Sequence, residues 1–189
     1  LPQSFQNILA NKIAEMTGTM GMMEPDNLET ILRILESAHT IQFAAVGNTI
    51  PVAMDGAFKF NQLGLRSVAM NSWEAQIAFT YNLLPQDVVI IISNSGSSRR
   101  LLSLARGAHE NGARIILITN NPSSSLAAVS DYQIITATRE KLLTKEFWFS
   151  RIPSILVIET LYLLLFVSKK DAAAHIRRHE DAIRPDKQN

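Results

Sequence analysis

The sequence predicts an α/β protein with a three-layer, doubly wound parallel sheet of about five strands flanked by helices. Three apolar runs carry this prediction, at residues 41–46, 87–92 and 114–118. Each run is followed by a polar, turn-forming segment and then by a helical pattern, which is the alternation that builds a parallel sheet. The strands of such a sheet are buried on both faces, so they read as continuous apolar runs.

Residues 1–36 are predicted to form two helices. The apolar residues between 9 and 16 have helical spacing, and the glycines at the ends of 18–21 predict a break after them. A second helical pattern covers residues 28–35, after polar residues that are typical of a helix start. This pattern is more apolar than one sheet face requires. We therefore expect the N-terminal helical segment to pack on the rest of the domain and on a dimer interface.

Two weaker strands, at residues 66–70 and 132–136, complete the expected sheet within a central domain of residues 37–168. From residue 140 onward the pattern is mainly helical. The last segment, residues 169–189, is charged and is expected to form a C-terminal helix and a tail that face solvent. The chain begins with Leu1 instead of methionine, which suggests a processed product or a piece of a longer polypeptide.

The composition indicates one globular domain. Of 189 residues, 47% are hydrophobic and 19% are charged, enough to bury one substantial core. Lysine and arginine total 18 and aspartate and glutamate total 17, a balance that excludes strong electrostatic binding of nucleic acid by this chain. Cysteine is absent from the sequence, which excludes disulfides, thiolate catalysis and zinc–thiolate sites.

No segment of the sequence predicts export or membrane insertion. The longest apolar stretch, residues 155–167, is interrupted by Glu159 and Thr160 and is shorter than the roughly 20 residues of a membrane-spanning helix. The N-terminus lacks a basic region followed by an apolar run and a cleavage site of small residues. We therefore expect a cytoplasmic protein without a membrane partner.

Hydroxyl and amide side chains follow each of the three strong strands. In an open parallel sheet, ligands bind beyond the carboxyl ends of the strands, where loops and helix N-termini present backbone donors. These loops therefore predict a rim suited to a phosphate and a polyol, although serine, threonine and asparagine are also the preferred helix caps. The predicted ligand-binding residues are Gly47, Asn48, Thr49, Ser93, Asn94, Ser95, Gly96, Ser97 and Ser98.

Catalytic and metal-binding residues are not evident in the sequence. An aldose–ketose isomerase needs a base within reach of the substrate carbon, and Glu140 and Glu74 are the candidates. Glu140 is retained as a candidate contact to a sugar hydroxyl, although a glutamate that begins a helix is more typical of the surface. The four histidines fall in segments read as helical and away from the rim. His175 and His179 lie one turn apart without a third ligand, so no metal is expected.

The loop at residues 92–98 resembles the sugar isomerase (SIS) domain, in which a strand ends in Ser-x-Ser-Gly-x-Ser/Thr and the serines hold a sugar phosphate. The turn at residues 46–49 is similar to the first turn of that family, with Ala45 where a glycine is usual. Residues 58–64 and 150–152 look most like the effector domains of RpiR-family transcription regulators. Arg100, where many SIS proteins have an acid, favours an anionic ligand.

The resemblance implies a flavodoxin- or Rossmann-like homodimer that binds a phosphorylated sugar effector without a cofactor. It also implies that DNA is contacted only by a helix-turn-helix domain upstream of this chain. The leading hypothesis is therefore the non-catalytic sugar-phosphate-sensing domain of a bacterial regulator. The alternatives are a stand-alone sugar-phosphate isomerase with Glu140 or Glu74 as base, and a dimerisation module in which the serines only cap helices.

Overall fold

The computed structural model describes residues 1–138 and 150–184 of the chain. Its helices are α1 (Pro2–Gly21), α2 (Pro25–Ser37), α3 (Ile50–Gln62), α4 (Trp73–Thr80), α5 (Arg99–Glu110), α6 (Ile152–Ser168) and α7 (Ala172–Ile183), with short 3-10 turns η1 (Gly47–Thr49) and η2 (Ala127–Val129). Its strands are β1 (Ile41–Ala45), β2 (Ser67–Ala69), β3 (Val88–Ile92), β4 (Arg114–Thr119) and β5 (Tyr132–Ile135). The expected strands therefore agree with the structure to within two residues at each end.

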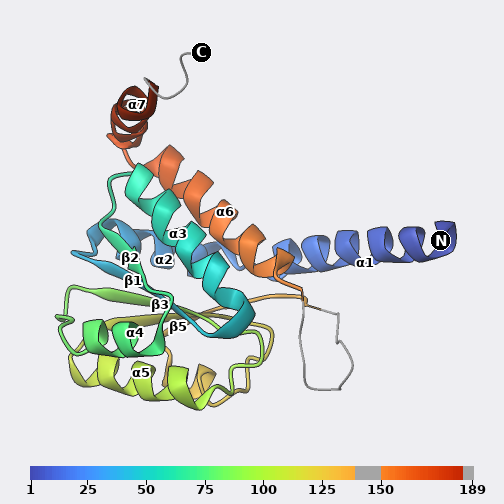
Figure 1. Cartoon of the computed structure of the whole chain (residues 1–189), viewed down its shortest axis with the longest axis horizontal. Helices are drawn as coiled ribbons and strands as arrows, with labels where there is room; N and C mark the ends of the chain where they lie inside the picture. Colours follow the sequence, from blue (N-terminus) through green and yellow to red (C-terminus); the bar gives the residue numbers. More distant parts are fainter. Residues whose placement is uncertain (139–149, 185–189) are drawn as a thin grey trace.

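The five strands form one parallel sheet in the order β2-β1-β3-β4-β5 (Figure 1). β1 pairs with β2 on one side and with β3 on the other, and its last residue, Ala45, lies opposite Ile92. The chain therefore moves outward from β1 to β2 and then crosses to the opposite side of β1. This reversal makes the carboxyl ends of β1 and β3 the switch point of the sheet, which is where open α/β sheets bind ligands. The predicted fold class is confirmed.

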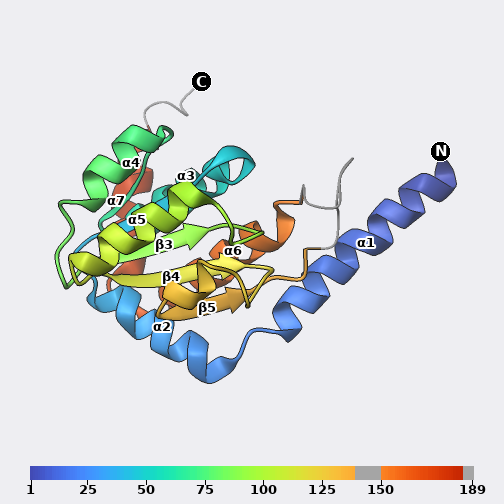
Figure 2. The same ribbon diagram turned by 90° about the horizontal axis from the view of Figure 1, so that it is seen from below.

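Helices cover both faces of the sheet and give three layers. α2, α3, α6 and α7 pack on one face, and α4 and α5 pack on the other (Figures 1 and 2). Successive strand residues point to opposite layers, so Phe43 belongs to the first core cluster and Ala44 to the second. Both residues are fully buried, and so is Gln42, the one polar residue of β1, whose amide is hydrogen-bonded to Gln76 and Thr80 of α4.

The first helix is longer than the sequence predicts. The expected break at residues 18–21 is wrong, because α1 continues to Gly21. Gly18 serves a close approach instead of a turn, since a Cβ atom there would lie 2.9 Å from the Cβ of Ala137. The first ten residues of α1 are exposed and project from the body of the domain (Figures 1 and 2).

The C-terminal helix α7 is less solvated than expected. Ala172 is buried and belongs to the core, and the ring of His179 lies 5.7 Å from that of Phe58 on α3. The imidazole of His175 covers Gly64, where a Cβ atom would come within 2.5 Å of the ring. Only the opposite face of α7, with Arg177 and Arg178 among its residues, points to solvent.

Helix α6 is apolar around most of its circumference: one side enters the core, and the other leaves Leu163, Phe166 and Val167 exposed. Val157, Leu161 and Leu165 are fully buried in the core. Among residues 1–138 and 150–184, no single helix is both long and apolar enough to cross a bilayer. α6 and α7 meet that length and composition test only as a pair, with a bend of 111° between them.

Candidate functional site

The structure brings the ends of β1, β3 and β4 together at one rim, as the sequence predicts. The Thr49 hydroxyl donates to the carbonyl of Ile92 at 3.2 Å, which joins the turn after β1 to the end of β3. The Ser93 N–H donates to the carbonyl of Ile118 at 3.0 Å, which joins β3 to β4. Thr49 and Ser93 are buried. The hydroxyl of Thr49 and the backbone N–H of Ser93 therefore hold the rim together from inside, and Gly47 and Asn48 form its more accessible turn.

The loop after β3 presents two hydroxyl groups outward. The Oγ atoms of Ser95 and Ser97 lie 3.0 Å apart, and the Ser97 N–H points to the Ser95 Oγ at 3.4 Å. Ser97 is exposed and Ser95 is half-buried. Ser98 instead caps α5, because its Oγ accepts a hydrogen bond from the Leu101 N–H. The capping alternative thus applies to Ser98, while the hydroxyls of Ser95 and Ser97 point outward from the rim.

Gly96 fixes the shape of this loop. Its φ is +63°, in the left-handed region, and a Cβ atom there would lie 2.0 Å from the Oγ of Ser124. The Gly96 carbonyl accepts hydrogen bonds from the N–H of Leu126 and the hydroxyl of Ser125, both in the segment that follows β4. The two loops therefore contact each other closely at Gly96, and only glycine fits between them.

Asn94 points into the protein and not into the crevice. Its side chain donates to the carbonyl of Ser150 at 3.1 Å and accepts from the hydroxyl of Ser154 at 3.3 Å. Its backbone carbonyl accepts from the N–H of Asn120 and the hydroxyl of Thr119. Asn94 is 6% exposed, so its side chain positions the loop and the start of α6 relative to each other.

The two residues before α6 were missed as site residues. Arg151 is exposed at the rim, and its Nη1 contacts the carbonyl of Asn48 at 3.5 Å. A cavity of about 340 Å³ between α3 and α6 is lined by Arg151, Asp55 and Glu159 among others. Lys59 forms ion pairs with both acidic residues of that cavity, at 2.9 Å to Glu159 and 4.0 Å to Asp55, and the hydrogen bond to Glu159 raises the pKa of Lys59. In the sequence, Ser150 and Arg151 were noted only for their resemblance to RpiR-family effector domains. Their spacing from the rim loops gave no indication that they contact them.

The two candidate bases are placed differently. Glu140 lies outside the described residues. Glu74 is exposed in the first turn of α4, after the edge strand β2. In the same helix Gln76 is buried, and its amide both donates to and accepts from the backbone of Ala45. Gln76 thereby completes the hydrogen bonding of β1 beyond the end of the short strand β2.

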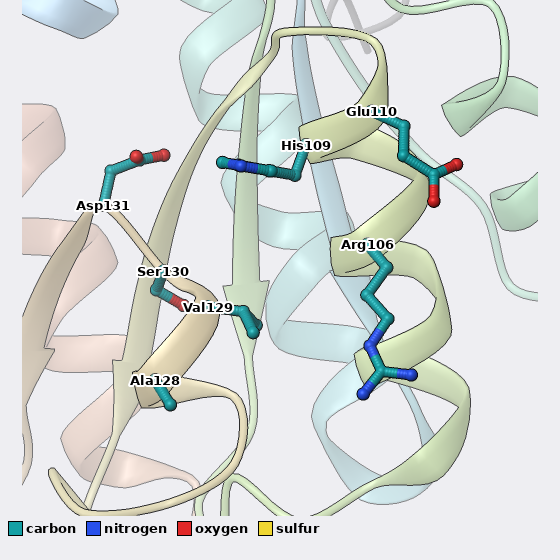
Figure 3. A pocket seen from close by; sticks show the side chains of 7 residues that line it. All are labelled: Arg106, His109, Glu110, Ala128, Val129, Ser130 and Asp131. Carbon is teal, nitrogen blue, oxygen red and sulfur yellow. The ribbon is translucent and has the colours of Figure 1, made fainter.

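The histidines lie away from the rim. His39 is in the turn before β1, not in a helix as expected, and its Nδ1 is 3.7 Å from a carboxylate oxygen of Asp87. His109 lines a groove of about 370 Å³ at the amino end of the sheet, together with Arg106, Glu110 and Asp131 (Figure 3). Asp131 already accepts a hydrogen bond from the Ile115 N–H. Among residues 1–138 and 150–184, no group of three or more acidic, histidine or cysteine side chains could hold a metal ion.

A hydroxyl-rich rim at the switch point of an open α/β sheet is chemically suited to a phosphorylated small molecule. The SIS domain family matches residues 34–164. The chain therefore belongs to the SIS domain family.

The chain is also similar to bacterial regulators. It is 24% identical over 178 residues to an uncharacterised HTH-type transcriptional regulator of Thermotoga maritima, covering 94% of this chain and 64% of that protein. Across five such regulators, the chain spans 54 to 64% of their length.

Solved structures share the fold. The sugar isomerase domain of an RpiR transcription factor from Sphaerobacter thermophilus has a TM-score of 0.84 at 22% identity, covering 93% of this chain and 97% of that one. The Vibrio vulnificus NanR protein complexed with ManNAc-6P has a TM-score of 0.86 at 18% identity, covering 94% and 67%. MJ1247 of Methanococcus jannaschii, with an inferred 3-hexulose-6-phosphate isomerase function, has a TM-score of 0.72 at 18% identity, covering 93% and 96%. The fold thus occurs in both regulators and proteins assigned as isomerases.

Proposed function

We propose that this chain is the sugar-phosphate-sensing domain of an RpiR-type transcription regulator. The observation that carries the proposal is the pair of outward hydroxyls, Ser95 and Ser97, at the start of α5. Hydroxyl groups and the N–H groups of a helix N-terminus both donate to a phosphate, and the helix dipole favours its negative charge. Asn48 and Arg151, which meet at the neighbouring turn, contact the sugar or share the phosphate. ManNAc-6P in the NanR complex supports this ligand class.

Regulation rather than catalysis is the second part of the proposal. The HTH-type relatives are longer than this chain, so a helix-turn-helix domain outside it contacts the DNA. Under this proposal, the whole protein is located in the cytoplasm. Glu140 stays a candidate ligand contact, and the division into residues 1–36, 37–168 and 169–189 stays a prediction.

The proposal is tested by thermal unfolding of the chain with a panel of sugar phosphates, ManNAc-6P included. A ligand that binds only the folded state raises the midpoint by mass action, with about 2.7 kcal/mol of stabilisation at a hundredfold excess over Kd. NMR of each stabilising mixture is expected to show the sugar phosphate unchanged. Conversion of the sugar would identify an isomerase, and a midpoint that no compound raises would leave the dimerisation module as the function.

We further propose that the chain is a homodimer formed through α1. An apolar stripe runs along this helix, with side chains that are 42 to 62% exposed. The stripe extends from Phe5 to Met20, about 22 Å along the helix axis, and an exposed apolar stripe of that length requires a partner surface. A second copy supplies one through a twofold axis, because each copy offers the same stripe. The stripe consists of Phe5, Leu9, Ile13, Met16 and Met20.

Leu9→Glu is expected to convert the dimer to a monomer, because it places a charge in the middle of the stripe. Sedimentation velocity across a concentration series measures the change. Asn7→Glu, on the opposite face of the same exposed helix turn, is the matched control and is expected to stay dimeric. A wild-type chain that sediments as a monomer at all concentrations would show that α1 does not form this interface.

A further inference from the structure

Three elements meet at the two residues that precede α6. The Ser150 hydroxyl donates to the carboxylate of Glu15 on α1 at 2.8 Å. The Ser150 carbonyl accepts from the Asn94 side chain at the end of β3, and Arg151 contacts the carbonyl of Asn48 after β1. One dipeptide thus connects the projecting helix α1 with both loops of the rim.

The contacts from α1 to the rim are buried. Glu15 is 0% exposed, Ser150 4% and Asn94 6%. Lys12 donates both to the Glu15 carboxylate and to the Ser150 hydroxyl, each at 3.1 Å. A buried carboxylate or amide that loses its partner is strongly unfavourable, so these groups move together or not at all. Because of this network, a movement of α1 is expected to move the rim as well.

The network continues into the ligand loop. Asn94 is followed directly by Ser95 and Gly96, and its carbonyl receives the N–H of Asn120 from the neighbouring loop. A second polar contact holds α1 one turn further along the same face, where the Thr19 hydroxyl accepts from the Ala137 N–H at 3.0 Å. α1 is thus attached to the carboxyl edge of the sheet by buried polar contacts, while its apolar stripe faces outward.

We propose that the Glu15–Ser150–Asn94 connection couples the occupancy of the rim to the position of α1. That a ligand is what shifts the rim rests on the proposed function. Coupling free energies are reciprocal, so a perturbation of α1 must also reach the rim in the ligand-free chain. A ligand that shifts Asn94 changes how α1 lies, and α1 carries the surface proposed to join two copies.

The first test uses the ligand-free chain and hydrogen exchange. Glu15→Ala is expected to speed the exchange of the Gly96 and Asn120 amides about tenfold, with the amides of β3 as the internal reference for global stability. Glu15→Gln retains an acceptor for Ser150 and is expected to keep exchange near the wild-type rate. Thr17→Ala, an exposed change on the same helix, is the control.

Ser150→Ala provides a second variant if Glu15→Ala unfolds. It removes the hydroxyl and keeps the carbonyl that holds Asn94, so the same two amides are expected to exchange faster. Faster exchange confined to α1 in both variants, with Gly96 and Asn120 unchanged, would overturn the coupling.

The second test adds the ligand, with ManNAc-6P as the first probe. In the wild type, binding is expected to change the exchange of α1 amides at least threefold, and Ser150→Ala is expected to bind while losing most of that change. Binding without any effect on α1 in the wild type would overturn the coupling and leave the proposed function intact. If no sugar phosphate binds, the proposed function fails, and the ligand-free comparison alone decides the coupling.

Discussion

Gly96→Ala is expected to abolish sugar-phosphate binding, with a loss of affinity above about a hundredfold, and to destabilise the fold by about 2 to 4 kcal/mol. Two effects add at this position. A φ of +63° disfavours any side chain, and the new Cβ atom would lie 2.0 Å from the Oγ and 2.4 Å from the Cβ of Ser124. Ser124 is buried and its Oγ accepts from the Ala127 N–H, so it has little freedom to move. Calorimetric titration and denaturant unfolding measure the two losses.

The double variant Gly96→Ala with Ser124→Gly separates the two effects. It removes the clash and leaves the backbone strain, so it is expected to recover stability to within about 1 to 2 kcal/mol of the Ser124→Gly single variant. Recovery of part of the binding is expected too. If Gly96→Ala alone bound a sugar phosphate as the wild type does, the contact between the two loops would have no role in the site.

Ser95→Ala is expected to weaken sugar-phosphate binding by about 1 to 3 kcal/mol, because a hydroxyl that donates to a phosphate makes a charge-assisted hydrogen bond. The free energy of unfolding is expected to change by less than about 0.5 kcal/mol, since the hydroxyl of Ser95 interacts with that of the exposed Ser97. The same titration and denaturant series measure both quantities, in the wild type and in the variant.

Ser98→Ala is the matched control in the same loop. The Ser98 side chain caps α5, so this variant is expected to lower the free energy of unfolding by about 1 kcal/mol. Its loss of sugar-phosphate affinity is expected to be smaller than that of Ser95→Ala. The opposite order, with full affinity in Ser95→Ala, would mean that the serines act as caps and that the ligand binds elsewhere. The pair thus distinguishes the two interpretations that the sequence left open for this loop.

The loop after β3 has an outer and an inner side. Ser95 and Ser97 face outward, Asn94 faces inward, and the three residues lie on one short loop. Under the proposed function, a ligand bound on the outer side contacts the same backbone that Ser150 holds on the inner side. Because the Ser150 hydroxyl also donates to Glu15, the proposed coupling would transmit a shift of this loop to α1.

Much of the fold could be predicted because its signals are local. The β-branched run of β3 and the apolar runs of β1 and β4 require burial on both faces, and a parallel sheet provides it. Glycine and serine directly after a strand predict a turn and a helix start. Because the strands are parallel, the loops after β1, β3 and β4 are then predicted to lie at the carboxyl edge of the sheet. The break at Gly18 was wrong because a glycine in a helix signals either an end or a close packing contact, and the sequence does not show that Ala137, 119 positions further along the chain, packs against it.

The sequence by itself determined the parallel sheet, the rim at its carboxyl edge and the loop that carries Ser95 and Ser97, since apolar periodicity and turn chemistry are properties of short segments. Only the tertiary structure decided which polar groups of that rim point outward and which form hydrogen bonds inside the protein. Thr49 and Asn94 find partners 43 and 56 residues away, and Glu15 reaches Ser150 across 135 residues. A hydrogen bond depends on positions within a few tenths of an ångström, and such positions are set only when distant segments pack.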